Sequence, residues 1–274
     1  HERIRTYTYL YPAEGRPDVY SDPTQAAEQA AFEVSRGFTA VKFDPAGPYT
    51  AFDGHQPSLD DIERSVAITG AIREAVGSRA DLLFGTHGQF TAAGAIRLAQ
   101  RLEPFDPLWF EEPTQPDQPE EMGRIARQTT IPVATGERLT TISEFAALAR
   151  HQAAAIWQPN LGRCGGLLAG KKIAAIAEAS GCQIAPHLYS GPILGAANIQ
   201  LAATVPNLLI VEGIQDWTGF HADLLTTPIE WEDGHVIPST EPGLGVELNE
   251  AVALAHPYPT DGELHLGMAD TPVR

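Results

Sequence analysis

The chain has 274 residues, 43% of them hydrophobic, which suits one barrel or two small packed domains. Its formal net charge of −17 argues against nucleic-acid and membrane partners, which need basic patches, and an anionic substrate would need a local cation or a metal. Cys164 and Cys182 fit no disulfide framework or zinc site. No apolar run is long enough for a membrane span, and the sequence shows no signal peptide, so we expect a cytoplasmic protein.

Strands and helices are expected to alternate along the chain. The first strands are expected at residues 5–10 and 39–44, and later apolar runs end at Gly85, Glu111, Glu137, Asn160, His187 and Glu212. Helices are expected at about 24–36, 58–77, 91–103, 117–128, 141–151, 166–180 and 192–204. The proline-rich residues 45–57 are expected to form a long loop over the site.

The apolar runs recur at a regular spacing and stop abruptly at a polar residue. Glu111 and Glu137 are 26 residues apart, which is the length of one strand–helix–strand repeat. One polar or special residue at each strand end is the plan of a barrel active site. We therefore predict an α/β fold over residues 1–215, either a TIM-type (β/α)8 barrel or a modified (β/α)7β barrel.

The remaining residues, 216–274, are too rich in apolar and turn-forming residues to be a disordered linker. We predict that this C-terminal segment packs on another part of the protein. Trp231, Leu244 and Leu248 are among the apolar side chains that it would bury.

Polar residues at the strand ends predict the chemistry of the site. Glu111 and Glu137 on adjacent parallel strands would repel each other unless a cation lay between them, and incomplete oxygen coordination suits Mg²⁺. The alternative is that each glutamate pairs with Lys42, with Arg138 or with a helix N-terminus. His187 and His87 are candidate acid–base groups.

The ordered set of motifs resembles the barrel domain of the enolase superfamily, in the mandelate racemase/muconate lactonizing enzyme subgroup that includes sugar-acid dehydratases and cycloisomerases. The matching segments, which cover essentially the whole chain, are residues 42–45, 86–88, 110–113, 136–138, 158–160 with 165–166, 185–187, 212 and 242–246.

The resemblance implies a Mg²⁺ ion that binds the carboxylate of a sugar acid and stabilises the enediolate formed when its α-proton is removed. His87 would help a β-hydroxyl to leave, and Glu212 would hydrogen-bond the carboxylate. The expected site residues are His187, His87, Lys42, Asn160 and Glu212 for catalysis, Asp44, Arg138 and Glu212 for substrate binding, and Glu111 and Glu137 for the metal.

Three features depart from the family pattern. Gly85 stands where a metal-binding Asp is expected, and Asn160 stands where an Asp orients the histidine; we expect Asn160 to accept a hydrogen bond from His187. The chain also begins at the first expected barrel strand, so we expect it to be a fragment, or a form lacking the N-terminal α+β lid on which residues 216–274 would pack.

The sequence therefore predicts a Mg²⁺-dependent dehydratase of sugar acids, expected to be a homo-oligomer. The alternatives are a cycloisomerase of a sugar lactone or anhydro sugar acid, and a catalytically weakened barrel that acts as a binding protein. A metal-independent aldolase that uses Lys42 as a Schiff base is a further alternative.

Overall fold

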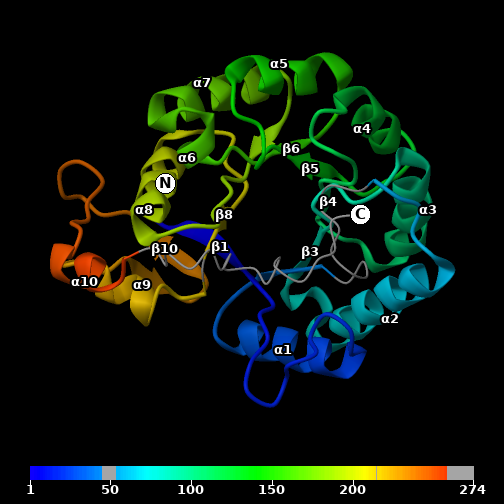
Figure 1. Cartoon of the computed structure of the whole chain (residues 1–274), viewed down its shortest axis with the longest axis horizontal. Coiled ribbons are helices and arrows are strands. Elements are labelled where there is room, and N and C mark those ends of the chain that lie inside the picture. The colour runs from blue at the N-terminus through cyan, green and yellow to red at the C-terminus, as the bar shows by residue number, and fades with distance from the viewer. Residues whose placement is uncertain (45–53, 214, 258–274) are drawn as a thin grey trace.

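The computed structural model describes residues 1–44, 54–213 and 215–257, and its strands form a closed barrel inside a ring of helices (Figure 1). The barrel strands are β1 (Ile4–Tyr9), β2 (Ala40–Phe43), β3 (Asp81–Gly85), β4 (Trp109–Glu111), β5 (Val133–Thr135), β6 (Ile156–Trp157), β7 (Gln183–Ile184) and β8 (Val211–Glu212). Consecutive strands pair in parallel from β1 to β7. β8 pairs with β1, and Leu209 N donates to Ile184 O, which closes the barrel.

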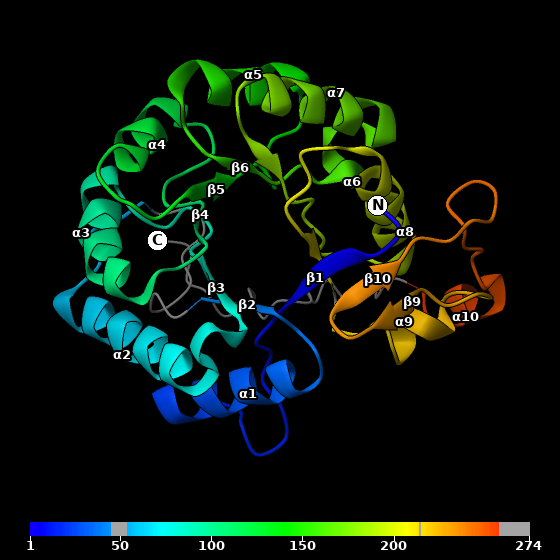
Figure 2. The same ribbon diagram turned by 180° about the vertical axis from the view of Figure 1, so that it is seen from behind.

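The helices lie outside the strands that they connect (Figures 1 and 2). They are α1 (Pro23–Ser35), α2 (Leu59–Val76), α3 (Ala92–Leu102), α4 (Pro119–Ala126), α5 (Ile142–His151), α6 (Leu161–Cys164), α7 (Gly166–Ala179) and α8 (Pro192–Thr204), with short 3₁₀ turns at Gly77–Arg79 and Glu103–Phe105. Beyond β8 come α9 (Phe220–Asp223), β9 (Glu230–Glu232), β10 (His235–Ile237) and α10 (Glu250–Ala255). The predicted alternation is confirmed, and the only helix in residues 215–229 is the four-residue α9.

Helix ends follow from local side-chain chemistry. Asp22 accepts hydrogen bonds from the backbone of Thr24 and Gln25 at the start of α1, and Ser58 accepts one from Asp61 N at the start of α2. Thr141 and Glu144 form a reciprocal capping box at the start of α5. These bonds satisfy backbone groups that a helix leaves unpaired, so the sequence defines these helix starts closely.

The barrel interior is filled by one side chain from each strand or from the residue next to it. These side chains form a separate apolar cluster of Tyr7, Ala40, Leu83, Trp109, Ala134, Ile156, Ala185 and Ile210. Trp109 and Tyr7 meet edge to face with their ring centroids 5.3 Å apart. A larger apolar cluster lies between the strands and the helices and includes Phe84, Phe110 and Trp157.

The interior layer determines what lies at the barrel mouth. Because strand side chains alternate, the residue two positions later on each strand again points inward. This step leads to a second ring, which consists of Tyr9, Lys42, Gly85, Glu111, Gly136, Gln158, His187 and Glu212.

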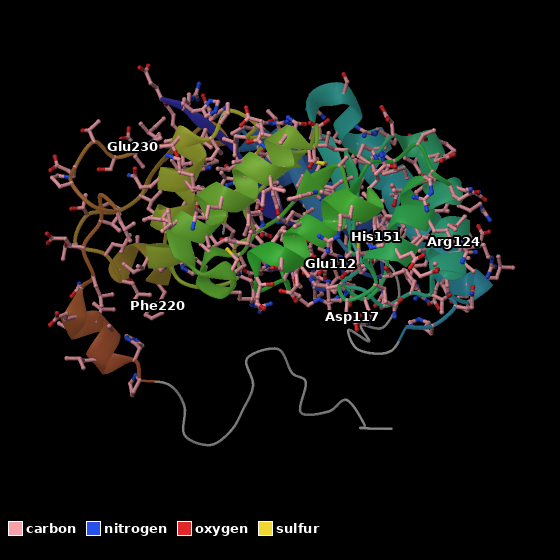
Figure 3. All side chains as sticks on the ribbon, turned by 90° about the horizontal axis from the view of Figure 1, so that it is seen from above. Glu112, Asp117, Arg124, His151, Phe220 and Glu230 are labelled. Carbon is pink, nitrogen blue, oxygen red and sulfur yellow. The ribbon has the colours of Figure 1, made fainter. Side chains whose placement is uncertain are left out.

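Strands β9 and β10 form an antiparallel hairpin that extends the sheet beside β1 (Figure 2). Val236 is fully buried in a cluster with Ile4 and Trp217, and the Trp231 ring lies 5.0 Å from that of Phe38. Figure 3 places Glu230 of this hairpin toward the opposite end of the barrel from Glu112 and Asp117. Part of the predicted C-terminal segment 216–274 is thus covered by the barrel itself, and packing of that segment on a lid stays a prediction.

Two sequence predictions fall on residues that the structure does not describe. Most of the loop expected over the site, residues 45–57, lies outside the described residues, as does the end of the C-terminal segment at 258–274. Among the described residues, no helix is both long and apolar enough to span a membrane.

Candidate active site

The predicted residues converge at the carboxyl ends of the barrel strands. Lys42, Glu111, His187 and Glu212 belong to the second interior ring, and each is at most 5% exposed. Glu137 follows the ring position Gly136, just after β5, and is 6% exposed. The mouth therefore carries three buried carboxylates with a lysine and a histidine among them.

Glu111 is held by three nitrogen donors. Its Oε1 atom accepts a hydrogen bond from Lys42 Nζ at 2.5 Å. Its Oε2 atom accepts from Trp109 Nε1 and from Gln158 Nε2, both at 2.9 Å. Trp109 lies on β4 itself, whereas Lys42 lies on β2 and Gln158 follows β6, each two strands away from β4, so interior positions on both sides of β4 hold the carboxylate in place.

Lys42 is charged despite its burial. Desolvation alone would lower the pKa of its ammonium group, but the carboxylates of Glu111, Glu212 and Glu137 outweigh desolvation and raise the pKa above its usual value. The Glu212 Oε1 atom lies 3.8 Å from Nζ, and Glu212 Oε2 accepts a hydrogen bond from Leu188 N at 2.7 Å. The alternative pairing of Glu111 with Lys42, considered from the sequence, is therefore present.

His187 contacts Asn160 on one side and carboxylates on the other. Asn160 Oδ1 accepts from Gly162 N at 2.9 Å as the N-cap of α6, so its Nδ2 donates to His187 Nδ1, also at 2.9 Å. The remaining ring proton then lies on Nε2, which is 3.2 Å from Glu137 Oε2 and 3.8 Å from Glu212 Oε2. The expectation that Asn160 accepts from His187 is wrong, because its oxygen is already used as the helix cap.

His87 forms a second imidazole–carboxylate arrangement. Its Nδ1 atom lies 2.8 Å from Asp44 Oδ2. Burial lowers the pKa of His87, but the hydrogen bond to Asp44 and the negative charge of Asp44 overcome this and raise the pKa to about 9. The imidazole is therefore protonated at neutral pH.

The backbone at the mouth is strained after β3 and after β4. His87 has a φ of 51° and Glu112 has a φ of 41°, values in the left-handed region that non-glycine residues rarely adopt. Gly88 N donates to Glu112 O at 2.7 Å, which ties the two segments together. Strain of this kind persists where surrounding contacts enforce it and is concentrated at functional sites.

Arg138 provides part of that enforcement. Its Nε donates to both Glu112 oxygens, at 2.9 and 3.2 Å, and another guanidinium nitrogen donates to His87 O at 3.0 Å. Arg138 thus positions His87, while its predicted contact with substrate stays a prediction. The ionised form of Glu137 is favoured: burial would raise its pKa, but the electrostatic effects of neighbouring side chains, His187 first and then His87 and Lys42, lower it to about 2.

Buried polar atoms without a partner mark where a ligand would bind. Among the described residues, Tyr9 Oη, Glu137 Oε2 and Gln158 Oε1 are buried and lack a hydrogen-bond partner. Native structures leave few such atoms, and each calls for an explanation. All three belong to the second ring or adjoin it, so polar groups of a substrate at the barrel mouth would satisfy them.

Tyr9, Trp109 and Gln158 also belong to the site, although the sequence motifs did not predict them. A signal for them was available, because the two-residue step from the interior layer leads from Tyr7 to Tyr9 and from Ile156 to Gln158. Trp109 lies one step below Glu111 on the same face and reaches it with its indole nitrogen.

The residues present do not fit the expected Mg²⁺ ion. Mg²⁺ prefers near-octahedral oxygen coordination, but Gly85 supplies no carboxylate and both oxygens of Glu111 already face nitrogen donors. Over residues 1–44, 54–213 and 215–257, no three His, Cys, Asp or Glu side chains are grouped so that they could hold a metal ion. Glu111 and Glu137 do lie at adjacent strand ends, yet each faces a cationic or ring nitrogen of the protein.

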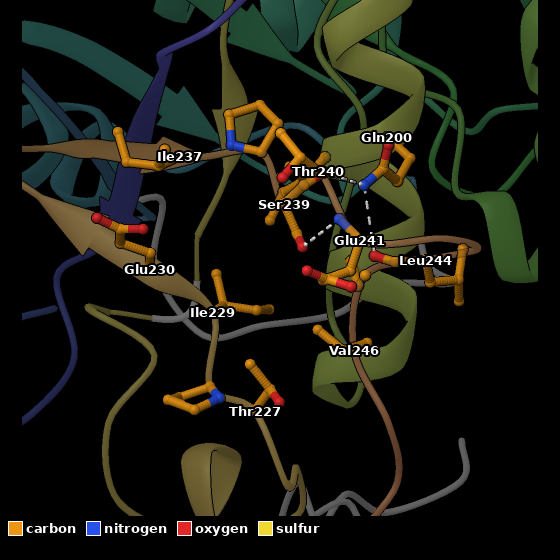
Figure 4. Close-up of a pocket in the computed structure, with 15 residues that line it drawn as sticks. Gln200, Thr227, Ile229, Glu230, Ile237, Ser239, Thr240, Glu241, Leu244 and Val246 are labelled. Carbon is orange, nitrogen blue, oxygen red and sulfur yellow. Dashed lines mark hydrogen bonds between the residues drawn. The ribbon is translucent and has the colours of Figure 1, made fainter.

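A separate pocket of about 340 Å³ lies between α8 and the segment after β10 (Figure 4). Gln200 donates to the carbonyl oxygens of Ser239 and Leu244 at its edge, and Ile229 and Val246 line its apolar wall. None of the site residues predicted from the sequence lines this pocket. We place the site at the barrel mouth, because the buried titratable groups converge there.

Comparisons with known proteins agree with this fold. Residues 25–252 match the family described as Enolase C-terminal domain-like. A proposed mandelate racemase/muconate lactonizing enzyme from Labrenzia alexandrii DFL-11 is 63% identical with a TM-score of 0.93, over 97% of this chain and 68% of that one. A second such protein, from Burkholderia SAR-1, is 58% identical with a TM-score of 0.95, over 100% of this chain and 68% of that one.

Curated relatives include named sugar-acid dehydratases. The D-gluconate dehydratase of Thermoproteus tenax is 33% identical over 84% of this chain and 46% of its own length. The D-xylonate dehydratase of Haloferax volcanii is 32% identical over 93% of this chain and 62% of its own length. The chain thus spans about half to three-fifths of these relatives. The family match and the structural likeness together establish that the chain belongs to the enolase superfamily, in its mandelate racemase/muconate lactonizing enzyme subgroup.

Proposed function

We propose that the protein removes water from a sugar acid, beginning with the proton α to the carboxylate. The names of the curated relatives, D-gluconate and D-xylonate dehydratase, support this substrate class. Since the chain spans only part of their length, the activity of the whole protein is our proposal.

The observation that carries the proposal is a pair of imidazoles at the barrel mouth that have different hydrogen-bond partners. His87 is positively charged because of Asp44, whereas the Nδ1 atom of His187 accepts a hydrogen bond from Asn160, which leaves the ring proton on Nε2. An elimination of water needs an acid for the departing hydroxyl and an acceptor for the α-proton. The mouth of the barrel offers one group for each role.

In the proposed reaction, the α-proton passes to the His187–Glu137 pair, in which the unpartnered Oε2 of Glu137 lies 3.2 Å from Nε2 of His187. The electron pair of the broken C–H bond forms a carbon–carbon double bond as the β-hydroxyl leaves. His87 gives its proton to that hydroxyl, which departs as water. The enol that remains tautomerises to a 2-oxo acid, and the unpartnered Tyr9 and Gln158 atoms bind substrate hydroxyls.

A sugar-acid library screened with the full-length protein tests this proposal. We expect at least one member to yield a 2-oxo acid, detected as its semicarbazone, with loss of one water by mass spectrometry. His87→Asn and His187→Asn should each lower kcat by about 10²–10⁴-fold, the usual contribution of a positioned acid–base group. His256→Asn, at an exposed histidine near the C-terminal end of α10, is the matched control and should leave kcat unchanged.

Product analysis separates the proposal from cycloisomerisation. A cycloisomerase of a sugar lactone would change the ring without loss of water. Normal turnover by His187→Asn, or a product of unchanged mass, would overturn the dehydratase assignment.

A further inference from the structure

Lys42 occupies an unusual position for a lysine. The chain has three lysines, and Lys171 and Lys172 are exposed on α7, whereas Lys42 is 1% exposed at the barrel mouth. Its ammonium nitrogen contacts Glu111 at 2.5 Å and lies 3.8 Å from Glu212. It also lies 5.1 Å from the centroid of the Tyr9 ring and 5.9 Å from that of Tyr7. Two carboxylates and two aromatic faces thus surround a fixed positive charge.

Gly85 makes room for this lysine. A Cβ atom built on Gly85 would lie 3.3 Å from Lys42 Cε and 3.1 Å from the Tyr9 hydroxyl, closer than side chains normally pack. The φ angle of Gly85 is not in the left-handed region, so its backbone does not require glycine. The physical reason for glycine at position 85 is therefore space at the barrel mouth, because a longer side chain there would compete with the stem of Lys42.

The geometry points to Lys42 as the resident cation of the site, in the place where related sites would use a divalent metal. This inference rests on the proposed function for its substrate class, a carboxylate of a sugar acid. Among the described residues, Nζ makes one hydrogen bond, to Glu111, so donors remain for an oxygen of the substrate. Lys42 keeps its proton throughout and stabilises the negative charge that develops on the substrate carboxylate as the α-proton leaves.

Glu111 then has a positioning role. It receives Lys42 on Oε1 and is itself fixed by Trp109 and Gln158 on Oε2. The carboxylate that would bind a metal here holds an ammonium group instead, and no divalent ion is needed to offset it.

Calorimetric titration of MgCl₂ into the full-length protein tests the inference without relying on turnover. We expect no saturable binding up to millimolar MgCl₂ in the wild type or in the matched control Lys171→Met. The double variant Lys42→Met/Gly85→Asp should gain a saturable Mg²⁺ site, because it removes the ammonium and adds a carboxylate. Saturable binding of one Mg²⁺ to the wild type, unchanged by Lys42→Met alone, would overturn the inference even if the double variant failed to fold.

A second measurement tests the role of the lysine in binding. D-gluconate should raise the melting temperature of the EDTA-treated wild type and of Lys171→Met, and Lys42→Met should lose that shift. If a library member is turned over, EDTA should change its rate less than twofold, and Lys42→Met should lower kcat by about 10²–10³-fold, the scale of losing one electrostatic donor. If EDTA abolishes turnover and MgCl₂ restores it, the inference is contradicted, whereas the proposed function is not. If no sugar acid is turned over, the proposed function is contradicted. The MgCl₂ titration then still decides whether Lys42 replaces a metal.

Discussion

At the scale of single residues, the orientation of the Asn160 amide determines which ring nitrogen of His187 carries the proton. Asn160 caps α6 with its oxygen and therefore offers its nitrogen to the imidazole. An aspartate at the same place would accept from Nδ1–H, which would favour the tautomer with a free Nε2 and raise the basicity of the ring. The hydrogen-bonding chemistry of this one position thus determines which ring nitrogen can take up a proton.

We predict that Asn160→Asp raises kcat for dehydration by about 10-fold or more, within the range of acid–base catalysis. The ¹⁵N chemical shifts of His187 should change from the Nε2–H to the Nδ1–H pattern. Asn249→Asp exchanges the N-cap asparagine of α10 far from the site, and it should change neither quantity. Unaltered ¹⁵N shifts in Asn160→Asp would show that the cap does not control the tautomer.

The His87–Asp44 pair makes both stability and activity depend on pH. The pKa of His87 is raised from 6.5 to about 9, so the folded state binds its proton more tightly than the unfolded chain does. The resulting stabilisation is complete below about pH 6.5 and is lost as the pH rises through about 9.

We therefore predict that the melting temperature falls between pH 6.5 and 9.5 in the wild type and falls less in His87→Asn. Turnover should decline above about pH 9, where His87 loses the proton that it gives to the leaving hydroxyl. Thermal denaturation and pH–rate profiles check both effects. Equal pH dependence of melting in the two proteins would rule out His87 as the group responsible.

At the scale of elements, the β9–β10 hairpin depends on a close approach between two glycines. Gly234, in the hairpin turn, has a φ of 71°, and a Cβ atom there would overlap the carbonyl oxygen of Gly37 just after α1. Thr6 completes the junction by donating its backbone N–H and its hydroxyl to Gly234 O, at 2.8 and 2.9 Å. The hairpin is thereby joined to the first strand and the first helix of the barrel.

Gly234→Ala should destabilise the protein by about 2–5 kcal/mol, which combines left-handed strain with overpacking. Gly15→Ala is the matched control, because Gly15 has a φ of 77° and a Cβ atom there would meet nothing within 4 Å. Gly15→Ala should lower the free energy of unfolding only by the left-handed backbone strain, about 1–2 kcal/mol. Chemical denaturation of both variants gives the difference, and equal losses would mean that the glycine contact contributes nothing.

At the scale of the whole molecule, Trp109 connects the barrel core with the active site. Its ring is fully buried in the interior layer, and its indole N–H donates to Glu111. Closure of the barrel by β8 against β1 makes that layer common to all eight strands. Loss of this side chain should therefore affect the stability of the entire barrel.

We predict that Trp109→Ala lowers the free energy of unfolding by about 3–5 kcal/mol, as expected for a large aromatic side chain that leaves a cavity. Trp109→Phe keeps most of the volume but removes the donor to Glu111. It should cost less stability and should still lower turnover, because Glu111 positions Lys42. Denaturant titration and kinetic measurements on both variants separate the packing role from the hydrogen bond.

The sequence by itself determined the repeat of strands and helices and the residues at the strand ends. Both depend on local patterns, namely apolar runs of strand length, helix caps such as Ser58 and the interval between Glu111 and Glu137. Local patterns were sufficient because parallel strands in a barrel bring their carboxyl ends to one face. The family resemblance of the ordered motifs was confirmed for the same reason.

Only the tertiary structure decided which partners these residues have. Lys42 meets Glu111 across 69 positions of sequence, and Asn160 meets His187 across 27. The β10 strand pairs with β1 from the far end of the chain, at Val236 and Ile4. Such contacts depend on barrel closure, on the space left by Gly85 and on a helix cap that occupies an amide oxygen. None of these leaves a periodic signal in the sequence, because each arises between residues that become neighbours only after the strands have paired.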